Sequence, residues 1–204
     1  MLIPTFHFHG QTMKSALTAF LRQHGATDHE IEQATNQGEP LELPTRHILL
    51  NQGEEPTYCY FLHDGICHAC YLTPEGKQFS KEFYWDQDVL IGFESLLGNM
   101  PSPFLLETLN ASRLIALPIA LLKEWRQQHS VLYRTLLERQ LQFKEHKERF
   151  MLIHSPEERY LLFTSNFPDL TERLSDYQIA SYLGITSTSL SRIKKRCQQQ
   201  NDEN

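Results

Sequence analysis

The stretch Thr57–Trp85, TYCYFLHDGICHACYLTPEGKQFSKEFYW, decides the fold of this chain. Its apolar and aromatic runs, TYCYFL, ICHACYL and KQFSKEFYW, are separated by turn signals at Asp64-Gly65 and Pro74-Glu75-Gly76. Runs of this length between such turns are typical of antiparallel strands. The stretch therefore predicts the centre of a small antiparallel β-roll or barrel.

The sequence on either side extends this pattern. The strand period begins near Leu41 and continues through FLLETLNA (Phe104–Ala111) and SRLIALP (Ser112–Pro118). Helical spacing of apolar residues predicts further elements at Thr12–His24, at Asp28–Gln37 and from Pro118 through Trp125. The expected fold class is α+β.

The longest helical pattern runs from Ser130 to about His154. Its apolar stripe consists of Leu132, Leu136, Phe143 and Phe150. An apolar stripe on an otherwise charged helix is typical of a helix that pairs with a long partner, so we predict dimerisation here. In the alternative interpretation the stripe packs only on its own domain, because Arg139, His146 and Lys147 interrupt a clean heptad.

A new helix is expected after this one. Ser155 is a candidate N-cap, Pro156 stands in the first turn and Glu158 follows three residues after the cap. This signature predicts the start of a separate C-terminal domain.

The segment YQIASYLGITSTSLSRIKKR, Tyr177–Arg196, has the spacing of a helix-turn-helix. Ala180 is small where two helices would cross, and Gly184 supplies the turn. The positions that must be apolar are occupied by Ile179, Leu183, Ile185, Leu190 and Ile193. An ordinary helical hairpin with a basic surface is the alternative.

The second helix of this segment, capped by Thr186 or Ser187, carries side chains suited to base edges and phosphates. The predicted DNA-binding residues are Thr186, Ser187, Thr188, Ser189, Ser191, Arg192, Lys194 and Lys195.

Charge is distributed unevenly along the 204 residues, whose net charge is -6. Residues 1–112 contain 5 Lys+Arg and 14 Asp+Glu, whereas residues 113–204 contain 14 and 11. Contact with a polyanion is therefore expected at the C-terminal end. The sequence lacks an export signal, a membrane-span pattern and the phosphate-loop, nucleophile-elbow and HExxH motifs of enzymes, so we expect a cytoplasmic protein that is not an enzyme.

Taken together, the roll, the long helix and the C-terminal segment resemble the CRP/FNR family of bacterial transcription regulators. The resemblance covers roughly 28–196 and is most specific in YFLHDGICHACYLTPEGKQFSKEFYWDQDVLIGFESLL and IASYLGITSTSLSRIKKR. It implies a cyclic-nucleotide-binding-like roll (a double-stranded β-helix), a homodimer, a palindromic promoter site on double-stranded DNA and contact with RNA polymerase. The expected domains are 1–128 (sensor), 129–154 (dimerisation helix) and 155–204 (DNA-binding). A dimeric signalling adaptor whose helix-turn-helix does not bind DNA is the alternative function.

The resemblance also assigns individual residues. Ser191 and Arg192 match the family's Ser-Arg pair on the recognition helix, where the arginine typically reads a guanine. Thr188 stands where the family has a glutamate, so the half-site should differ from the best-known consensus. The chain ends soon after this helix, so the β-hairpin wing of many members is expected to be reduced or absent.

The effector pocket is expected to be degenerate. The corresponding residues are Gly92, Phe93, Glu94, Ser95, Leu96 and Phe104. Glu94 can be aligned with the family's ribose glutamate if Phe93 is an insertion, but Phe104 or Pro103 replaces the phosphate-binding arginine. Between Lys81 and Arg113 there is no Lys, Arg or His, so a buried phosphate would lack a cationic partner. Neither cyclic AMP, another cofactor nor a metal is expected, and the sequence does not identify the effector.

The cysteines of the roll allow one more hypothesis. A two-residue turn at Asp64-Gly65 would place Cys59 opposite Cys70 and Phe61 opposite His68. This register predicts a reversible Cys59–Cys70 redox pair, with two buried, inert thiols as the alternative.

Overall fold

A computed structural model describes residues 5–202, and the surroundings of side chains 10–199. These residues form two compact units. The first contains the roll, the helices before and after it and the N-terminal half of a long helix. The second contains the C-terminal half of that helix, the helices that follow and residues 70–82 of the strand region. Among the described residues, no helix combines the length and the hydropathy needed to cross a bilayer.

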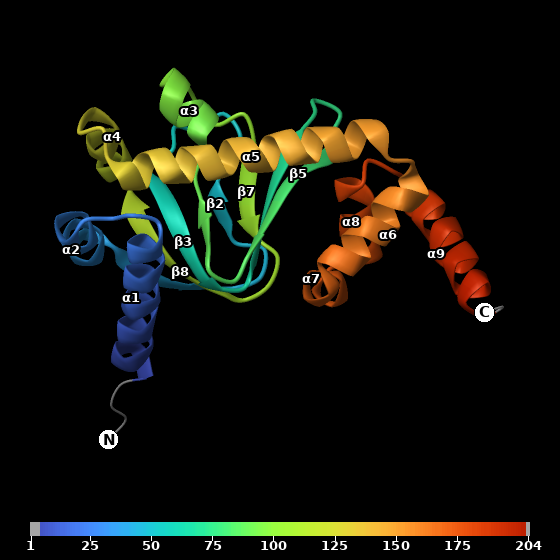
Figure 1. Cartoon of the computed structure of the whole chain (residues 1–204), viewed down its shortest axis with the longest axis horizontal. Helices are drawn as coiled ribbons and strands as arrows, with labels where there is room; N and C mark the ends of the chain where they lie inside the picture. The colour runs from blue at the N-terminus through green and yellow to red at the C-terminus, as the bar shows by residue number, and fades with distance from the viewer. Residues whose placement is uncertain (1–4, 203–204) are drawn as a thin grey trace. The chain divides into compact units, whose positions relative to one another are not determined.

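The elements follow one another in the order predicted, and Figure 1 labels most of them. The first unit begins with two helices, and the strands enclose one short helix. Its elements are α1 (Thr5–Gln23), α2 (Asp28–Gln37), β1 (Glu39–Leu43), β2 (Ile48–Leu50), β3 (Tyr58–Asp64), β4 (Ile66–Leu72), β5 (Gln78–Trp85), β6 (Asp88–Leu90), α3 (Phe93–Gly98), β7 (Leu105–Thr108), β8 (Ser112–Pro118) and α4 (Ile119–Gln127).

The remaining elements are all helical. They are α5 (Val131–Ile153), α6 (Pro156–Asn166), α7 (Pro168–Arg173), α8 (Asp176–Tyr182) and α9 (Ser187–Asp202). Ser155 caps α6 and Glu158 completes the capping box, as predicted. Helix α1 begins at Thr5 rather than at Thr12.

The strands form two four-stranded sheets, ordered β1-β8-β3-β6 and β2-β7-β4-β5. Strand β3 lies beside β8 (Figure 1). In this pairing Tyr60 is opposite Ala116 and Phe61 is opposite Ile115. The predicted α+β fold with an antiparallel roll is confirmed. The predicted pairing of β3 with β4 is wrong, because the two strands belong to different sheets.

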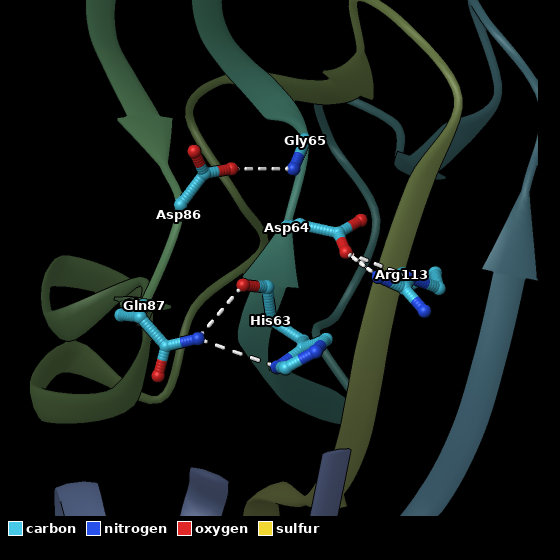
Figure 2. A network of polar contacts seen from close by, with 6 residues as sticks. All are labelled: His63, Asp64, Gly65, Asp86, Gln87 and Arg113. Atoms are coloured by element: carbon cyan, nitrogen blue, oxygen red, sulfur yellow. Dashed lines mark hydrogen bonds and ion pairs between the residues drawn. The ribbon is translucent and has the colours of Figure 1, made fainter. Parts of the chain in front are cut away.

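The chain changes sheets at Gly65, which has φ +119°. The Asp64 carboxylate accepts a hydrogen bond from Arg113 Nε at 2.7 Å, and the Gly65 N–H donates to Asp86 at 2.7 Å (Figure 2). The Ile66 N–H donates to the Asn110 side chain at 2.7 Å. The last two contacts satisfy backbone N–H groups at the corner, and the Asp64–Arg113 contact joins the side chains of β3 and β8 there.

Two apolar clusters fill the first unit. The outer core lies between the helices and one face of β3 and β8, and it includes Leu17, Phe61, Ile115, Trp125 and Leu132. The inner core lies between the sheets. It consists of Tyr60, Leu62, Cys67, Ala69, Tyr84, Leu90, Phe104, Leu106, Leu114 and Ala116. Residues of β3 and β8 therefore alternate between two apolar environments, which explains the nearly continuous apolar runs of these two strands in the sequence.

Candidate nucleic-acid interface and effector domain

Helices α8 and α9 are joined by a tight turn. Gly184 adopts φ +68° there, a backbone conformation that glycine enters without steric cost. The Gly184 N–H donates to the Ser181 carbonyl and the Ile185 N–H to the Ala180 carbonyl, which closes the end of α8. Four of the five predicted apolar positions are buried between the helices, and Ile185 is half-buried.

Thr186 is the cap of α9. Its Oγ1 accepts a hydrogen bond from the Ser189 N–H at 3.1 Å and lies 2.9 Å from Ser189 Oγ. The structure thus decides between the two predicted caps, because Ser187 is already the first helical residue. Two of the predicted DNA-binding hydroxyls are partly engaged in this capping.

The outward face of α9 presents Ser187, Thr188, Ser191, Arg192 and Lys195, all of them exposed. We call these five residues the α9 face. Lys194 lies toward α8 instead, where its ammonium donates to Asp176 at 2.8 Å. That hydrogen bond raises the pKa of Lys194. Arg196 is also engaged, with the Glu157 carboxylate of α6 at 2.7 Å. The structure therefore separates Lys194 from the other predicted DNA-binding residues.

The residues of the predicted apolar stripe on α5 lie in two different environments. Leu132 and Leu136 are buried in the outer core, 0% and 5% exposed. The prediction that these two face a second copy is wrong, because the first unit itself covers them. Phe143 and Phe150 are half-buried, and with Phe163 and Tyr182 they line a crevice of about 380 Å³ in the second unit.

A half-buried cation in the second unit, Lys147, was noted from the sequence only as a break in the heptad. The Lys147 ammonium lies 4.0 Å from the centre of the Tyr182 ring and donates to the Lys81 carbonyl. Burial lowers the pKa of Lys147 to about 7, and Lys144 and Lys81 add to this lowering while Glu82 opposes it. Lys144 donates to the Glu82 carboxylate. The sequence signal that could have revealed this site is the position of Lys147 within the apolar stripe of the long helix.

The predicted effector-pocket residues lie at the start of α3 and in the inner core. Gly92 precedes α3, Glu94 is exposed, and Ser95 and Leu96 are buried. Phe93 packs edge-on against Tyr133 in the outer core.

Phe104 occupies the region where the family's arginine would be expected. Its side chain is 3% exposed and belongs to the inner core. A Cβ added at Gly92 would lie 3.6 Å from Phe104 Cζ, so the phenyl ring packs directly on the backbone before α3. An apolar ring in this place offers no charge or hydrogen bond to a phosphate.

The cysteine hypothesis rested on the β3–β4 register, which does not form. Cys59 belongs to the outer core, and its thiol points toward the Leu117 carbonyl on β8 at 3.6 Å. Cys59 and Cys70 are both thiols in the structure, on strands of different sheets. Burial raises the pKa of Cys59 to about 12. The predicted redox pair is therefore withdrawn, because its facing register is absent and the Cys59 thiol is held in its unreactive form.

Comparison with known proteins agrees with this architecture. Residues 40–129 match the family model described as the cyclic nucleotide-binding domain. No curated protein sequence matches the chain.

Several solved structures share the fold. One is a candidate crp/fnr-family transcriptional regulator from Eubacterium rectale, with TM-score 0.70, 13% identity and coverage of 86% of this chain and 85% of that one. FixK2 from Bradyrhizobium japonicum has TM-score 0.65 and 18% identity, covering 80% and 86%. The CRP-family transcriptional regulator TTHB099 from Thermus thermophilus has TM-score 0.62 and 18% identity, covering 79% and 85%.

Proposed function

We propose that the protein regulates transcription by binding DNA in a sequence-specific manner. The proposal is supported by the match of residues 40–129 to the cyclic nucleotide-binding domain and by the fold that the chain shares with solved CRP/FNR-family regulators. The observation that carries this proposal is the α9 face. It presents three hydroxyls, a guanidinium and an ammonium on the exposed side of a helix that is capped and packed against α8.

The α9 face has the chemistry for both kinds of DNA contact. Arg192 can donate two hydrogen bonds to the O6 and N7 of a guanine in the major groove, while Lys195 can neutralise a phosphate. Ser187 at the first turn lies where the N-terminal end of a recognition helix approaches the bases. In this proposal α8 and α9 form the helix-turn-helix, with α9 as the recognition helix.

The proposed protein is a homodimer, so its site on double-stranded DNA is palindromic. Since Leu132 and Leu136 are buried, the proposed contact uses the exposed apolar residues of α5, Leu141 and Leu152, which are 59% and 76% exposed. They are spaced by three helical turns and therefore lie on one side of the helix. Contact with RNA polymerase at a promoter is part of the same proposal.

The proposed effector domain does not bind cyclic AMP. The support is the position of Phe104 in the inner core and the exposure of Glu94. A ligand phosphate would have to displace a buried phenyl ring and would meet no cation between Lys81 and Arg113.

The test is selection of bound sequences from a random duplex pool by the full-length protein, followed by binding to the selected duplex over a range of salt concentrations. We expect a palindromic consensus and an affinity that falls steeply with salt, since each phosphate contact releases about one counterion. Equal binding of selected and scrambled duplexes would contradict sequence-specific regulation. Complete absence of DNA binding would favour the dimeric adaptor.

A paired measurement tests the dimer. Light scattering of the wild-type protein should give the mass of two chains, and Leu141→Glu should shift it toward one. Leu161→Glu is the matched control, because Leu161 is a 47% exposed leucine on α6. A monomeric wild type, or a dimer unchanged by Leu141→Glu, would contradict the proposed contact.

A further inference from the structure

The crevice of about 380 Å³ in the second unit has the dimensions of a ligand site. Its described lining residues all fall within 143–182, so they belong to this one unit. They come from the C-terminal half of α5 and from the helices that follow it. Small-molecule sites have volumes of roughly 300–1,000 Å³ and are lined mainly by apolar and aromatic side chains. The crevice is therefore large enough for one small ligand.

The walls of the crevice are aromatic. The five aromatic side chains that line it are Phe143, Phe150, Phe163, Phe167 and Tyr182. Phe163 is buried, and its ring centroid lies 5.7 Å from that of Phe167 and 5.4 Å from that of Tyr182. Both separations are favourable for aromatic pairs. The rings thus form a packed apolar wall against which a further aromatic ring can lie.

The ionisable groups around these rings are basic. His146, Lys147, Arg149 and His154 line the crevice, and its described lining residues include no aspartate or glutamate. Glu82 acts on Lys147 from outside this lining, and its carboxylate accepts a hydrogen bond from Lys144. The crevice therefore complements an anion.

The charge of the crevice suits a single negative charge. Arg149 stays protonated at physiological pH, and its guanidinium presents a planar fork of donors that fits a carboxylate. Burial lowers the pKa of Lys147 to about 7, and the Lys81 carbonyl accepts a hydrogen bond from its ammonium. Lys147 is therefore only partly charged at neutral pH. A monocarboxylate is a better match than a dianion.

The crevice is separate from the proposed dimer contact. Phe143 and Phe150 each lie two positions along α5 from one of the exposed leucines, Leu141 and Leu152. Two positions correspond to about 200° around a helix axis. The two phenylalanines and the two leucines therefore lie on opposite sides of α5, and a dimer formed through the leucines leaves the crevice open.

We propose that this crevice binds an aromatic monocarboxylate, whose ring packs on the aromatic walls while its carboxylate pairs with Arg149. Such a ligand contacts both α5 and α8, because Phe150 and Tyr182 line the same space. The inference goes beyond the proposed function, since binding of this ligand requires no DNA.

The experiment is calorimetric titration of the full-length protein with 2-naphthoate in the absence of DNA. We expect saturable binding of one equivalent per chain. 2-Naphthamide keeps the rings but has no charge, so it should bind about tenfold more weakly. Octanoate keeps the charge but has no ring, so it should also bind more weakly than 2-naphthoate. Absence of saturable 2-naphthoate binding, or equal affinity for the amide, overturns the proposal.

Variants locate the site. Arg149→Gln should weaken 2-naphthoate binding about fivefold, the upper end for an exposed ion pair, and leave 2-naphthamide binding unchanged. Arg149 is exposed, so this variant should keep its fold, which circular dichroism verifies. Arg134→Gln is the matched control, because Arg134 is a 66% exposed arginine on the same helix outside the lining. Equal weakening by the two substitutions, or by neither, overturns the assignment of Arg149.

A second copy of the chain is the competing occupant of the crevice. Phe150→Ala removes one ring of the wall and no charge, so it should weaken 2-naphthoate and 2-naphthamide by similar factors. Light scattering should give this variant the same mass as the wild type. A variant that loses its partner chain, from a wild type that does not bind 2-naphthoate, overturns the proposal and assigns the crevice to the second copy.

Discussion

The inner core of the roll is built from apolar and aromatic side chains, whereas the α9 face is built from hydroxyls and cations on an exposed helix. In the inner core each position is constrained by the volume and polarity of its neighbours. On the α9 face the side chains are constrained mainly by what they would bind. The difference teaches that substitutions in the two regions should fail for different reasons, in stability for the roll and in recognition for α9.

The sharpest way to break this comparison is Phe104→Arg, which places a guanidinium where a family member would bind a phosphate. We expect a loss of about 3–5 kcal/mol in the free energy of unfolding, because the inner core supplies no partner for the charge. Urea unfolding followed by circular dichroism measures the loss.

The control at the same position is Phe104→Leu, which should cost less than about 1.5 kcal/mol because it keeps the site apolar. Calorimetric titration with cyclic AMP completes the test. A stable Phe104→Arg protein that acquires cyclic AMP binding would show that the roll retains a working ligand pocket, and the contrast with α9 would disappear.

The corner at Gly65 gives the next largest expected effect. A Cβ at this position would lie 2.2 Å from Ser112 Oγ and 2.9 Å from Ser112 Cα, at φ +119°. We expect Gly65→Ala to lower the free energy of unfolding by about 3 kcal/mol, because steric overlap adds to backbone strain. Gly76→Ala is the matched control, since Gly76 also has positive φ (+76°) but nothing within 4 Å of its added Cβ. Equal losses in thermal unfolding would mean that φ alone, and not the approach to Ser112, requires glycine at the corner.

On the α9 face, Arg192→Ala should cost about 1–3 kcal/mol of DNA affinity and relax the preference at one base pair. Its fold should be unaffected, because Arg192 is exposed. Competition binding with single-base variants of the selected duplex measures both effects. If affinity and preference both persist, another part of the chain reads the bases.

The two adjacent lysines sharpen the comparison within α9. Lys195→Ala should weaken binding to all sequences similarly and reduce the slope of log affinity against log salt by about 1. Lys194→Ala should change that slope less, because the Lys194 ammonium is engaged by Asp176. Identical slopes for the two variants would show that DNA draws Lys194 away from Asp176.

Lys147 should produce the smallest effect, visible as a pH dependence of stability. Its folded pKa, about 7, lies below the ordinary value of 10.5. The unfolded chain therefore binds more protons between these values, and stability should rise as pH increases through this window. From pH 7 to 8 the wild type should gain about 1 kcal/mol relative to Lys147→Met. Parallel profiles of the two proteins in urea unfolding would contradict the lowered pKa.

Local sequence signals predicted the elements well. The capping box of Ser155 and Glu158 and the turn at Gly184 depend on neighbours within a few residues, so spacing alone reveals them. The apolar positions of α8 and α9 were readable for the same reason. By contrast, the partner of β3 depends on side chains far along the chain, among them Arg113 and Asn110, which hold the corner at Gly65.

The burial of the α5 stripe was hidden by a similar ambiguity. A helical apolar stripe records that a face is buried but not what buries it, so Leu132 and Leu136 fit a second copy and an internal core equally well.

The depth of the cysteines has a practical consequence for measuring DNA binding. Burial raises the pKa of Cys59 and of Cys67 to about 12, so at pH 7 only about one molecule in 10⁵ carries either thiolate. Cys197 is half-exposed on α9, one residue after Arg196. A maleimide dye used briefly at neutral pH should therefore attach at Cys197 well before Cys59 or Cys67 reacts. The native chain thus offers a fluorescent reporter position on the helix whose encounter with a duplex is to be followed.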